Sequence, residues 1–178
     1  MEAIKKIVII GPESTGKSTL CLQLASHYTT AWCPEYAREY LQALGRPYTY
    51  EDLLLIAKGQ LEYEEKYLSE AKDGLYFIDT NQYVMKVWCE VAFDRCHSWI
   101  LQQIANRRYD LYLLCNTDLP WEEDALREYP DQEFRHKLYL MYKDLLVNNG
   151  TPWEEISGQQ NERIESAIGI IDRFRQEY

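Results

Sequence analysis

The sequence lacks the features that mark membrane, secreted and nucleic-acid-binding proteins. No stretch approaches the roughly 18 consecutive apolar residues that cross a bilayer, and the N-terminal segment shows no cleavage-like site, so we expect a cytoplasmic protein without a membrane partner. Basic residues are outnumbered, with 19 Lys and Arg against 29 Asp and Glu and a formal net charge of −10. This balance weighs against nucleic acid as a partner, because nucleic-acid-binding surfaces are basic.

Cysteines are few and form no C-x-x-C pair. The five are scattered, at Cys21, Cys33, Cys89, Cys96 and Cys115. An odd, scattered set without a secretion signal is typical of reduced, mostly buried thiols. Cys96 and His97 are adjacent, but no second pair of ligands accompanies them, so we predict no metal site there.

Repeats, low-complexity tracts and Pro/Gly/Ser linkers are also missing. The length of 178 residues suits one domain, spanning 1–178. Short apolar runs alternate with longer amphipathic stretches, which predicts an α/β fold with a parallel sheet. We expect strands at 6–10, 29–33, 75–78, 110–115 and 153–156, and helices at 17–28, 35–44, 49–71, 82–91, 98–107, 132–147 and 161–174.

The most informative motif is G-x-x-x-x-G-K-[ST], which occurs once, from Gly11 to Ser18. Chance would produce it in roughly 1 of 200 chains of this length. A buried-type strand precedes it and an amphipathic helix follows, which is the context that a phosphate-binding loop requires. We expect the nucleotide to contact Gly11, Glu13, Ser14, Thr15, Gly16, Lys17, Ser18 and Thr19.

Each position of this loop has a physical role. Gly11 and Gly16 let the backbone curl without a Cβ in the way. The N–H groups at the start of the helix then point at phosphate oxygens, aided by the helix dipole. Lys17 places a positive charge near the β and γ phosphates, and Ser18 offers a hydroxyl to Mg²⁺.

Asp79 directly follows the expected strand 75–78. It therefore lies at the carboxyl edge of the sheet, where ligands of open α/β sheets bind. There it would hold Mg²⁺ together with Ser18 or accept a hydroxyl proton. The alternative is an N-cap for the next helix.

Glu35 and Arg38 follow the second strand at the same edge, and their spacing of three places them on one helix face. Glu35 would bind the hydroxyls of a polyol or take a proton, while Arg38 would steady negative charge. The alternative is a solvated pair on the helix surface.

Asp124 and Arg127 lie on a polar segment that we expect to form a lid, at about 120–137, with Arg135 and Lys137 nearby. A lid carrying arginine would close over ATP and exclude water. Surface salt bridges are the alternative and are slightly favoured by the sequence alone.

Aromatic residues are abundant, with 15 tyrosines and five tryptophans. Several fall near the expected acceptor pocket, namely Trp32, Tyr36, Tyr40, Tyr48 and Tyr50. A ring there could stack on a planar base. Each one taken alone is more often a packing residue than a ligand contact.

Four segments, in this order and spacing, resemble the ribosylnicotinamide kinase domain of the NadR type. They are Gly-Pro-Glu-Ser-Thr-Gly-Lys-Ser-Thr-Leu (11–20), Glu-Tyr-Ala-Arg-Glu-Tyr (35–40), Phe-Ile-Asp-Thr (77–80) and Pro-Trp-Glu-Glu-Asp-Ala-Leu-Arg (120–127). The resemblance covers almost the whole chain. It implies a three-layer P-loop kinase fold, with a five-stranded parallel sheet covered by helices on both faces.

The resemblance also implies ATP-dependent phosphorylation of nicotinamide riboside to NMN. Glu35, Arg38 and Asp79 become substrate or catalytic positions, and Asp124 and Arg127 become lid residues. The chain departs from the family at Pro34, where Trp is frequent, and at Asn81, where a second acidic residue is usual. No counterpart of the adenylyltransferase and DNA-binding domains of the bifunctional regulator is present, so we expect a stand-alone domain.

The leading hypothesis is therefore an ATP- and Mg²⁺-dependent kinase acting on a nucleoside 5′-hydroxyl, with nicotinamide riboside first. Its catalytic residues would be Lys17, Asp79, Glu35, Arg38 and Arg127. One alternative is a regulatory P-loop ATPase that has no small-molecule acceptor, and another is a kinase of a different nucleoside or metabolite. The partners are then a nucleoside triphosphate and a small nucleoside, and a homo-oligomer is left open.

ATP is favoured over GTP because the segment 116–119 lacks the lysine of the guanine-reading N-K-x-D signature. The turn at 157–159 is expected near the adenine, by analogy with the fold.

Overall fold

The computed structural model describes residues 4–124, 126–159 and 161–177, so 1–3, 125, 160 and 178 of the expected domain lie outside it. In chain order the elements are β1 (Lys5–Ile10), α1 (Lys17–His27), β2 (Trp32–Cys33), α2 (Tyr36–Leu44), α3 (Tyr50–Leu68), β3 (Leu75–Asp79), α4 (Gln82–Phe93), α5 (Ser98–Asn106), β4 (Leu111–Cys115), α6 (Gln132–Asn149), β5 (Trp153–Ile156) and α7 (Asn161–Glu177). The five strands form one parallel sheet in the order β2-β3-β1-β4-β5. The predicted α/β fold is confirmed.

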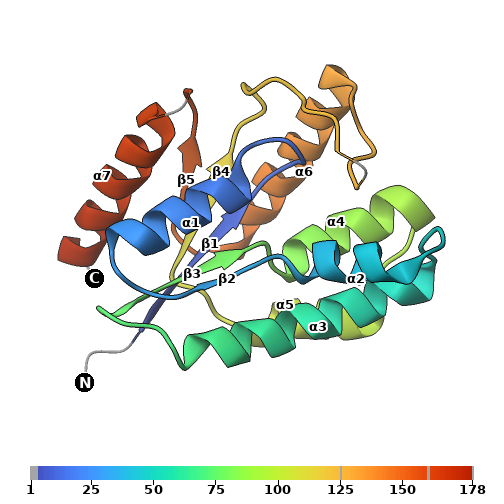
Figure 1. Ribbon diagram of the computed structural model, residues 1–178, viewed down its shortest axis with the longest axis horizontal. Coiled ribbons are helices and arrows are strands. Elements are labelled where there is room, and N and C mark those ends of the chain that lie inside the picture. Colours follow the sequence, from blue (N-terminus) through green and yellow to red (C-terminus); the bar gives the residue numbers. More distant parts are fainter. Residues whose placement is uncertain (1–3, 125, 160, 178) are drawn as a thin grey trace.

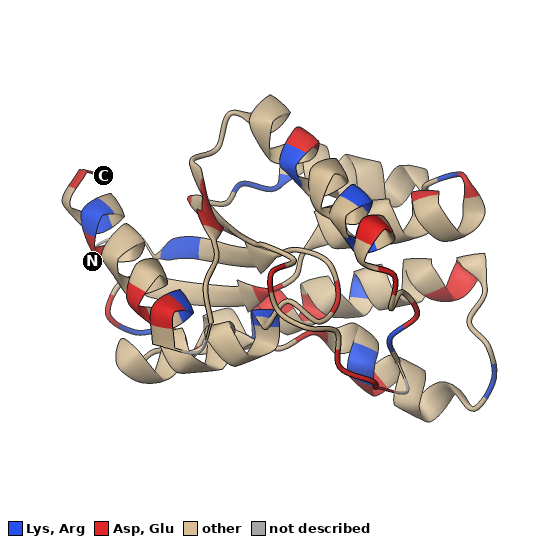
Figure 2. Ribbon diagram, turned by 90° about the horizontal axis from the view of Figure 1, so that it is seen from above, with Lys and Arg blue, Asp and Glu red and all other residues tan. Residues whose placement is uncertain are grey.

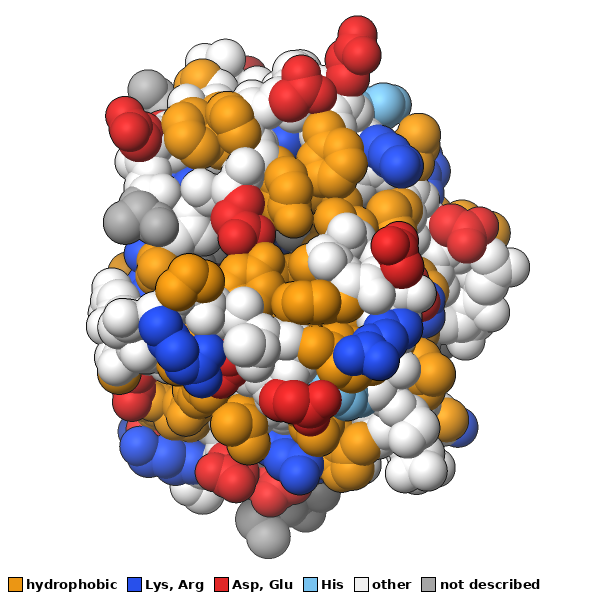
Figure 3. All heavy atoms as spheres, turned by 90° about the vertical axis from the view of Figure 1, so that its right-hand side faces the viewer, with side chains coloured by type: hydrophobic (Ala, Val, Ile, Leu, Met, Phe, Trp, Pro, Cys, Tyr) orange, Lys and Arg blue, Asp and Glu red, His pale blue; other side chains and the backbone are white. Residues whose placement is uncertain are grey.

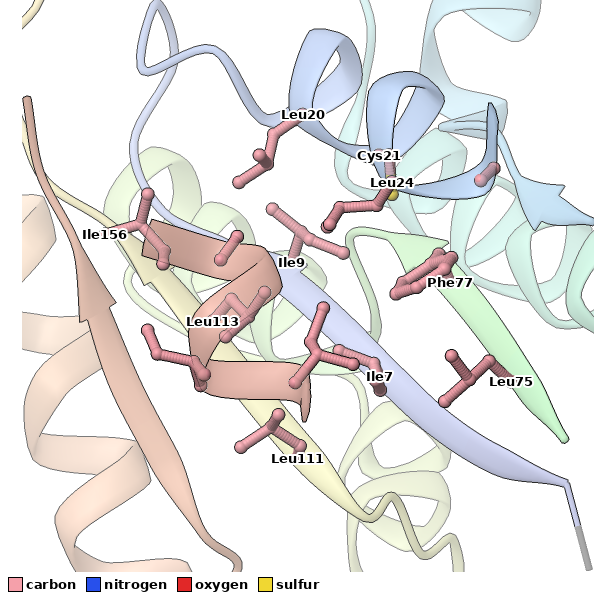
Figure 4. Packing of buried hydrophobic residues seen from close by; sticks show 14 of the residues in the cluster. Ile7, Ile9, Leu20, Cys21, Leu24, Leu75, Phe77, Leu111, Leu113 and Ile156 are labelled. Atoms are coloured by element: carbon pink, nitrogen blue, oxygen red, sulfur yellow. The ribbon is translucent and has the colours of Figure 1, made fainter. Parts of the chain in front are cut away.

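Helices cover both faces of this sheet, giving three layers (Figure 1). Ile7 and Ile9 of β1 pack with α1 and α7, as Figure 4 shows. Val8 and Ile10, the alternate residues, pack toward α4 and α6 on the other face. All four are fully buried, which explains why this strand is a continuous apolar run rather than an alternating one.

Most element boundaries agree with the sequence prediction to within a few residues. The second strand is shorter than expected, because only Trp32 and Cys33 pair with β3. Gly45 ends α2 in the left-handed conformation (φ 66°), and Thr49 with Asp52 forms a capping box at the start of α3. The segment 122–128 is not helical in its described residues.

The strand order determines which loops meet at the carboxyl edge of the sheet. β1 lies between β3 and β4, and Ile9 is in register with Asp79. The loop that follows β1 therefore begins beside the residue that ends β3. Two sequence segments more than 60 residues apart meet at the carboxyl edge of the sheet, where ligands of such sheets bind.

The surface carries interspersed charges. Lys and Arg occur on separate helices and loops, interleaved with Asp and Glu (Figure 2). On the face shown in Figure 3, hydrophobic side chains lie among charged and polar ones. Among the described residues, no helix has the length and apolar character of a bilayer-spanning segment.

The thiols follow the sequence expectation. Four cysteines are buried and free, and Cys96 is half-buried. No metal-binding group of three or more His, Cys, Asp or Glu side chains is found in the described part of the chain, including around Cys96 and His97.

Candidate active site

The loop between β1 and α1 needs glycine at two positions. Gly11 has φ 146°, and a Cβ there would lie 2.7 Å from the carbonyl oxygen of Cys115. Gly16 precedes α1 with φ 77°, in the left-handed region that favours glycine. The two glycines let the loop curl closely over the end of β4 and enter α1.

This curl leaves the first N–H groups of α1 facing the loop, since an α-helix has no internal partner for them. The loop is closed by its own polar groups. Pro12 carbonyl oxygen accepts hydrogen bonds from the Thr15 hydroxyl and the Lys17 ammonium, each at 2.7 Å. Helix N–H groups and a lysine around one concave turn form a site for an anion such as phosphate.

Asp79 and Ser18, the two expected metal ligands, are in contact. The Ser18 hydroxyl donates a hydrogen bond to Asp79 Oδ2. Asp79 Oδ1 is buried and has no hydrogen-bond partner among the described residues. Burial, followed by the negative charge of Glu35, raises the pKa of Asp79 to about 7, against the opposing effect of Lys17.

These observations fit a magnesium ion. Mg²⁺ binds through one or two carboxylates together with substrate phosphates, so a larger acidic cluster is not required. Asp79 supplies an unpartnered carboxylate oxygen and Ser18 a hydroxyl beside it. A cation would also relieve the cost of a buried charge, because it favours the ionised carboxylate.

The capping alternative for Asp79 is wrong. The N-cap of α4 is Asn81, whose side chain accepts a hydrogen bond from Tyr83 N at 3.0 Å. Asn81 also donates to the Tyr112 hydroxyl at 3.0 Å and is itself buried. Asn81, which departs from the family pattern, therefore has a structural role as the helix cap, and Asp79 does not cap α4.

A cavity of about 200 Å³ extends from the loop toward α2 and α4. Glu35 and Arg38 both line it. The expected shared helix face is wrong, because Glu35 is the extended N-cap that precedes α2 and only Arg38 belongs to the helix. No hydrogen bond or ion pair engages the Glu35 carboxylate within residues that the structure describes. Asp79 does not line this cavity and lies beneath Ser18.

One wall of the cavity is apolar and was not identified from the sequence. It is formed by Val84, Val87, Trp88 and Val91 of α4. Their positions i, i+3, i+4 and i+7 form one helix face, which sequence reasoning would assign to the core. Ala37, Leu41, Leu126, Tyr129, Leu138 and Tyr142 add to the apolar lining.

The aromatic residues singled out from the sequence lie elsewhere. Tyr36, Tyr40, Tyr48 and Tyr50 pack against the cluster formed by α2, α3, α4 and α5, and Trp32 packs on the α1 side of the sheet. None of the five is among the lining residues of the cavity.

The segment 116–131 joins β4 to α6, and its residues Leu126 to Tyr129 line the cavity. It contains Asp124 and Arg127 of the expected lid, whereas Ala125 lies outside the described residues. Asp124 forms an ion pair with Arg38 at 3.1 Å. Arg127 lines the cavity and donates to the Glu122 carbonyl at 2.6 Å.

Glu13 and Ser14 bind this segment to the loop. The Glu13 carboxylate accepts from the backbone N–H groups of Glu128, at 3.0 Å, and Tyr129. The Ser14 hydroxyl accepts from Glu122 N at 2.9 Å. These two residues, expected to contact nucleotide, therefore also hold the cavity cover in place.

Arg135 differs from its expected position on a lid. It belongs to the first turn of α6 and is fully buried. Its guanidinium donates to the carbonyl oxygens of Ser14 at 3.0 Å and Leu119 at 3.3 Å. Arg135 thus fixes the base of the segment 116–131 against the loop.

The turn at 157–159 is held to the segment 116–118. Gly158 N donates to Asp118 at 2.6 Å, and the Asp118 carboxylate also pairs with Arg163. Arg163 is 5% exposed and donates to the Asn116 carbonyl at 3.1 Å. The two loops at this end of the sheet form one hydrogen-bonded unit.

Known proteins are similar to this chain in sequence and in fold. A family model described as an AAA domain matches residues 6–163. The trifunctional NAD biosynthesis/regulator protein NadR of Escherichia coli K12 is 30% identical over 150 residues, which cover 82% of this chain and 36% of that protein.

Solved structures show the same fold. A crystal structure of NadR protein in complex with NR has a TM-score of 0.80 at 24% identity, over 96% of this chain and 51% of that one. Thymidylate kinase from Ehrlichia chaffeensis has a TM-score of 0.67 at 13% identity, over 95% and 99%. The chain spans about a third of the length of the curated relative and about half of the NadR crystal structure. The resemblance to NadR is confirmed, and the chain belongs to the AAA domain family whose model it matches from residue 6 to residue 163.

Proposed function

We propose that this protein is an ATP- and Mg²⁺-dependent kinase that phosphorylates the 5′-hydroxyl of a nucleoside, with nicotinamide riboside as the leading acceptor. The observation that supports it most strongly is the single cavity lined by both the phosphate-binding loop and Glu35. A phosphoryl donor and an acceptor hydroxyl would meet there, as phosphoryl transfer requires. The similarity to NadR, which is named for NAD biosynthesis, supports the acceptor.

The loop would hold the triphosphate through its N–H groups and Lys17. Lys17 donates to Pro12 of the same loop, so its ammonium is already directed inward. Ser18 and Asp79 would hold magnesium, which neutralises charge on the phosphates when bound. In this reaction positioning and electrostatics supply nearly all of the catalysis.

Glu35 is the better placed of the two carboxylates to act on the acceptor. It lines the cavity, whereas Asp79 lies beneath Ser18 and would be occupied by magnesium. We therefore assign to Glu35 the acceptor hydroxyl, which it would orient and deprotonate as the phosphoryl group arrives.

The segment 116–131 would serve as the lid. Arg127 lines the cavity and would stabilise charge on the moving phosphoryl group. Arg38, held by Asp124 at 3.1 Å, would add a second positive charge at the mouth. With the segment in place, water is kept from the reacting phosphate, which limits hydrolysis of ATP.

The apolar wall of α4 supports an acceptor with a planar ring. Trp88 and the three valines present a largely apolar surface to the cavity. Such a surface accommodates a base or pyridinium while polar groups elsewhere hold the ribose.

The test uses ATP labelled at the γ-phosphate and a panel of nucleosides. Transfer of label to nicotinamide riboside supports the proposal, and transfer only to another nucleoside identifies a kinase of different specificity. Release of free phosphate without transfer to any acceptor would instead identify a regulatory ATPase. Lys17→Ala serves as the inactive control.

A further inference from the structure

A chain of hydrogen bonds joins the apolar wall of the cavity to the phosphate-binding loop. The indole Nε1–H of Trp88 donates to the Tyr48 hydroxyl at 3.0 Å. The Tyr48 hydroxyl donates to Glu128 Oε2 at 2.9 Å. The backbone N–H of Glu128 donates to Glu13 Oε1 at 3.0 Å. The chain therefore runs from α4 through the cavity cover to the phosphate-binding loop.

The two ends of this chain face different parts of the same cavity. Trp88 belongs to the apolar wall, and Glu13 belongs to the phosphate-binding loop. Glu128 also lines the cavity, whereas Tyr48 lies behind the wall, with its ring edge-on to Trp88 at 5.1 Å between centroids. Tyr48 is therefore the link that touches neither the nucleotide nor the acceptor region.

The direction of each bond is set by chemistry. An indole N–H can only donate, and a carboxylate can only accept. Burial, the largest influence, raises the pKa of the Tyr48 hydroxyl and Glu128 raises it further, against the opposing effect of the hydrogen bond from Trp88. The hydroxyl thus keeps its proton at neutral pH and serves as acceptor from Trp88 and donor to Glu128 at once. Hydrogen bonds linked in this way strengthen one another.

We infer that Tyr48 is a positioning residue, which couples nucleotide binding at the phosphate-binding loop to the orientation of Trp88 in the apolar wall of the cavity. This inference rests on the proposed function. A triphosphate that binds the loop would change the position of Glu13. The hydrogen bond between Glu13 and the backbone of Glu128 would then shift Glu128, including its carboxylate. Tyr48 transmits that change to the indole. The acceptor wall is then set by the nucleotide, which favours ordered binding with the donor first.

The experiment follows the indole N–H signal of Trp88 by ¹⁵N NMR, assigned through its loss in Trp88→Phe. The probe is Mg²⁺ with a non-hydrolysable ATP analogue, without any acceptor. We expect a clear shift of this signal in the wild type. In Tyr48→Phe the shift should fall about threefold or more, while the Kd of the nucleotide changes by less than about twofold, because the coupling and not the binding is lost.

Two further variants make the result specific. Glu128→Ala breaks the next bond at an exposed residue and should reproduce the loss of shift in a folded protein. Tyr63→Phe removes a comparable tyrosine–carboxylate hydrogen bond, to Glu39, outside the chain and should leave the shift intact.

An unchanged shift in both Tyr48→Phe and Glu128→Ala, or no shift in the wild type, would overturn the inference. Because no acceptor is used, the outcome is separate from the labelled-ATP assay. A protein that fails to phosphorylate any nucleoside can still show the coupling between the nucleotide and Trp88, and an active kinase can still lack this coupling.

Discussion

The hydroxyl of Ser18 donates a hydrogen bond to the carboxylate of Asp79, 61 residues further along the chain. Ser18 stands in the first turn of α1 and Asp79 ends β3, so the bond joins the phosphate-binding loop to the neighbouring strand. The other oxygen of Asp79 is buried without a partner among the described residues. A carboxylate held in this way is destabilised when ionised and available to a cation.

Asp79→Asn should therefore change the pH dependence of stability. The pKa of Asp79 is raised to about 7, so the folded protein binds more protons than the unfolded chain between about pH 4 and pH 7. The contribution of Asp79 to the free energy of unfolding falls as pH rises through this window. A shift of this size corresponds to roughly 4 kcal/mol, an upper bound on the gain from the substitution above pH 7. Urea unfolding at pH 5 and pH 8 measures it.

Asp144→Asn is the control, since Asp144 is exposed on α6 and should show little difference between the two pH values. Adding Mg²⁺ to the wild type should flatten its pH dependence, because a bound cation favours the ionised Asp79. If Asp79→Asn gains no more stability at pH 8 than at pH 5, ionisation of the buried Asp79 carboxylate does not destabilise the fold.

Lys17→Ala should remove turnover without unfolding the protein. The Lys17 ammonium contacts the Pro12 carbonyl within the loop and contributes little to the core. The loss of one preorganised charge at the transition state costs about 3–4 kcal/mol of barrier, by analogy with oxyanion donors. Lys66→Ala, which removes an exposed lysine on α3, should retain activity. Normal turnover by Lys17→Ala would exclude the loop from the mechanism.

Glu35→Gln should lower kcat by roughly two to three orders of magnitude, because the amide cannot take the acceptor proton. The substitution preserves size, and Glu35 makes no side-chain cap bond to α2, so the fold should be unaffected. Glu39→Gln changes a neighbouring exposed carboxylate and is the matched control. Equal rates for the two variants would remove Glu35 from catalysis.

Gly59→Ala should destabilise the protein and disturb the start of α2. A Cβ at Gly59 would lie 2.1 Å from the ring of Tyr36, whose backbone N–H is held by Gln60 at 2.8 Å. Overpacking of this kind costs about 1–3 kcal/mol. The displaced ring should also move the adjacent Glu35, so kcat falls with stability.

Chemical denaturation compares this variant with Gly169→Ala on α7, where a Cβ meets nothing within 4 Å. That change should stabilise the protein by up to about 1 kcal/mol through helix propensity. Stability gains in both variants would show that Tyr36 gives way without cost.

The parts of the fold that could be predicted from sequence are those set by local physics. The continuous apolar run at 6–10 predicts a strand covered on both faces, and Ile7 to Ile10 are fully buried. The phosphate-binding loop follows from two glycines and a lysine at fixed spacing. Placing Asp79 beside Ser18 required only that parallel strands end at one edge of the sheet.

The acceptor wall could not be predicted in the same way. Val84, Val87 and Trp88 form an apolar helix face, and periodicity is identical whether such a face meets a core or a cavity. The distinction depends on where α2 and the segment 116–131 stop, which is a matter of long-range packing. The expectation that each aromatic ring taken alone is a packing residue holds for Tyr36, which packs between helices.

The segment 116–131 is attached to Glu13 and Ser14 of the phosphate-binding loop through main-chain amides, those of Glu122, Glu128 and Tyr129. Every residue except proline carries such a group, so the attachment to Glu13 and Ser14 depends on the path of the chain and not on its side chains. Substitutions along this stretch can therefore change what enters the cavity without breaking these hydrogen bonds, whereas proline at any of the three positions would remove one of them.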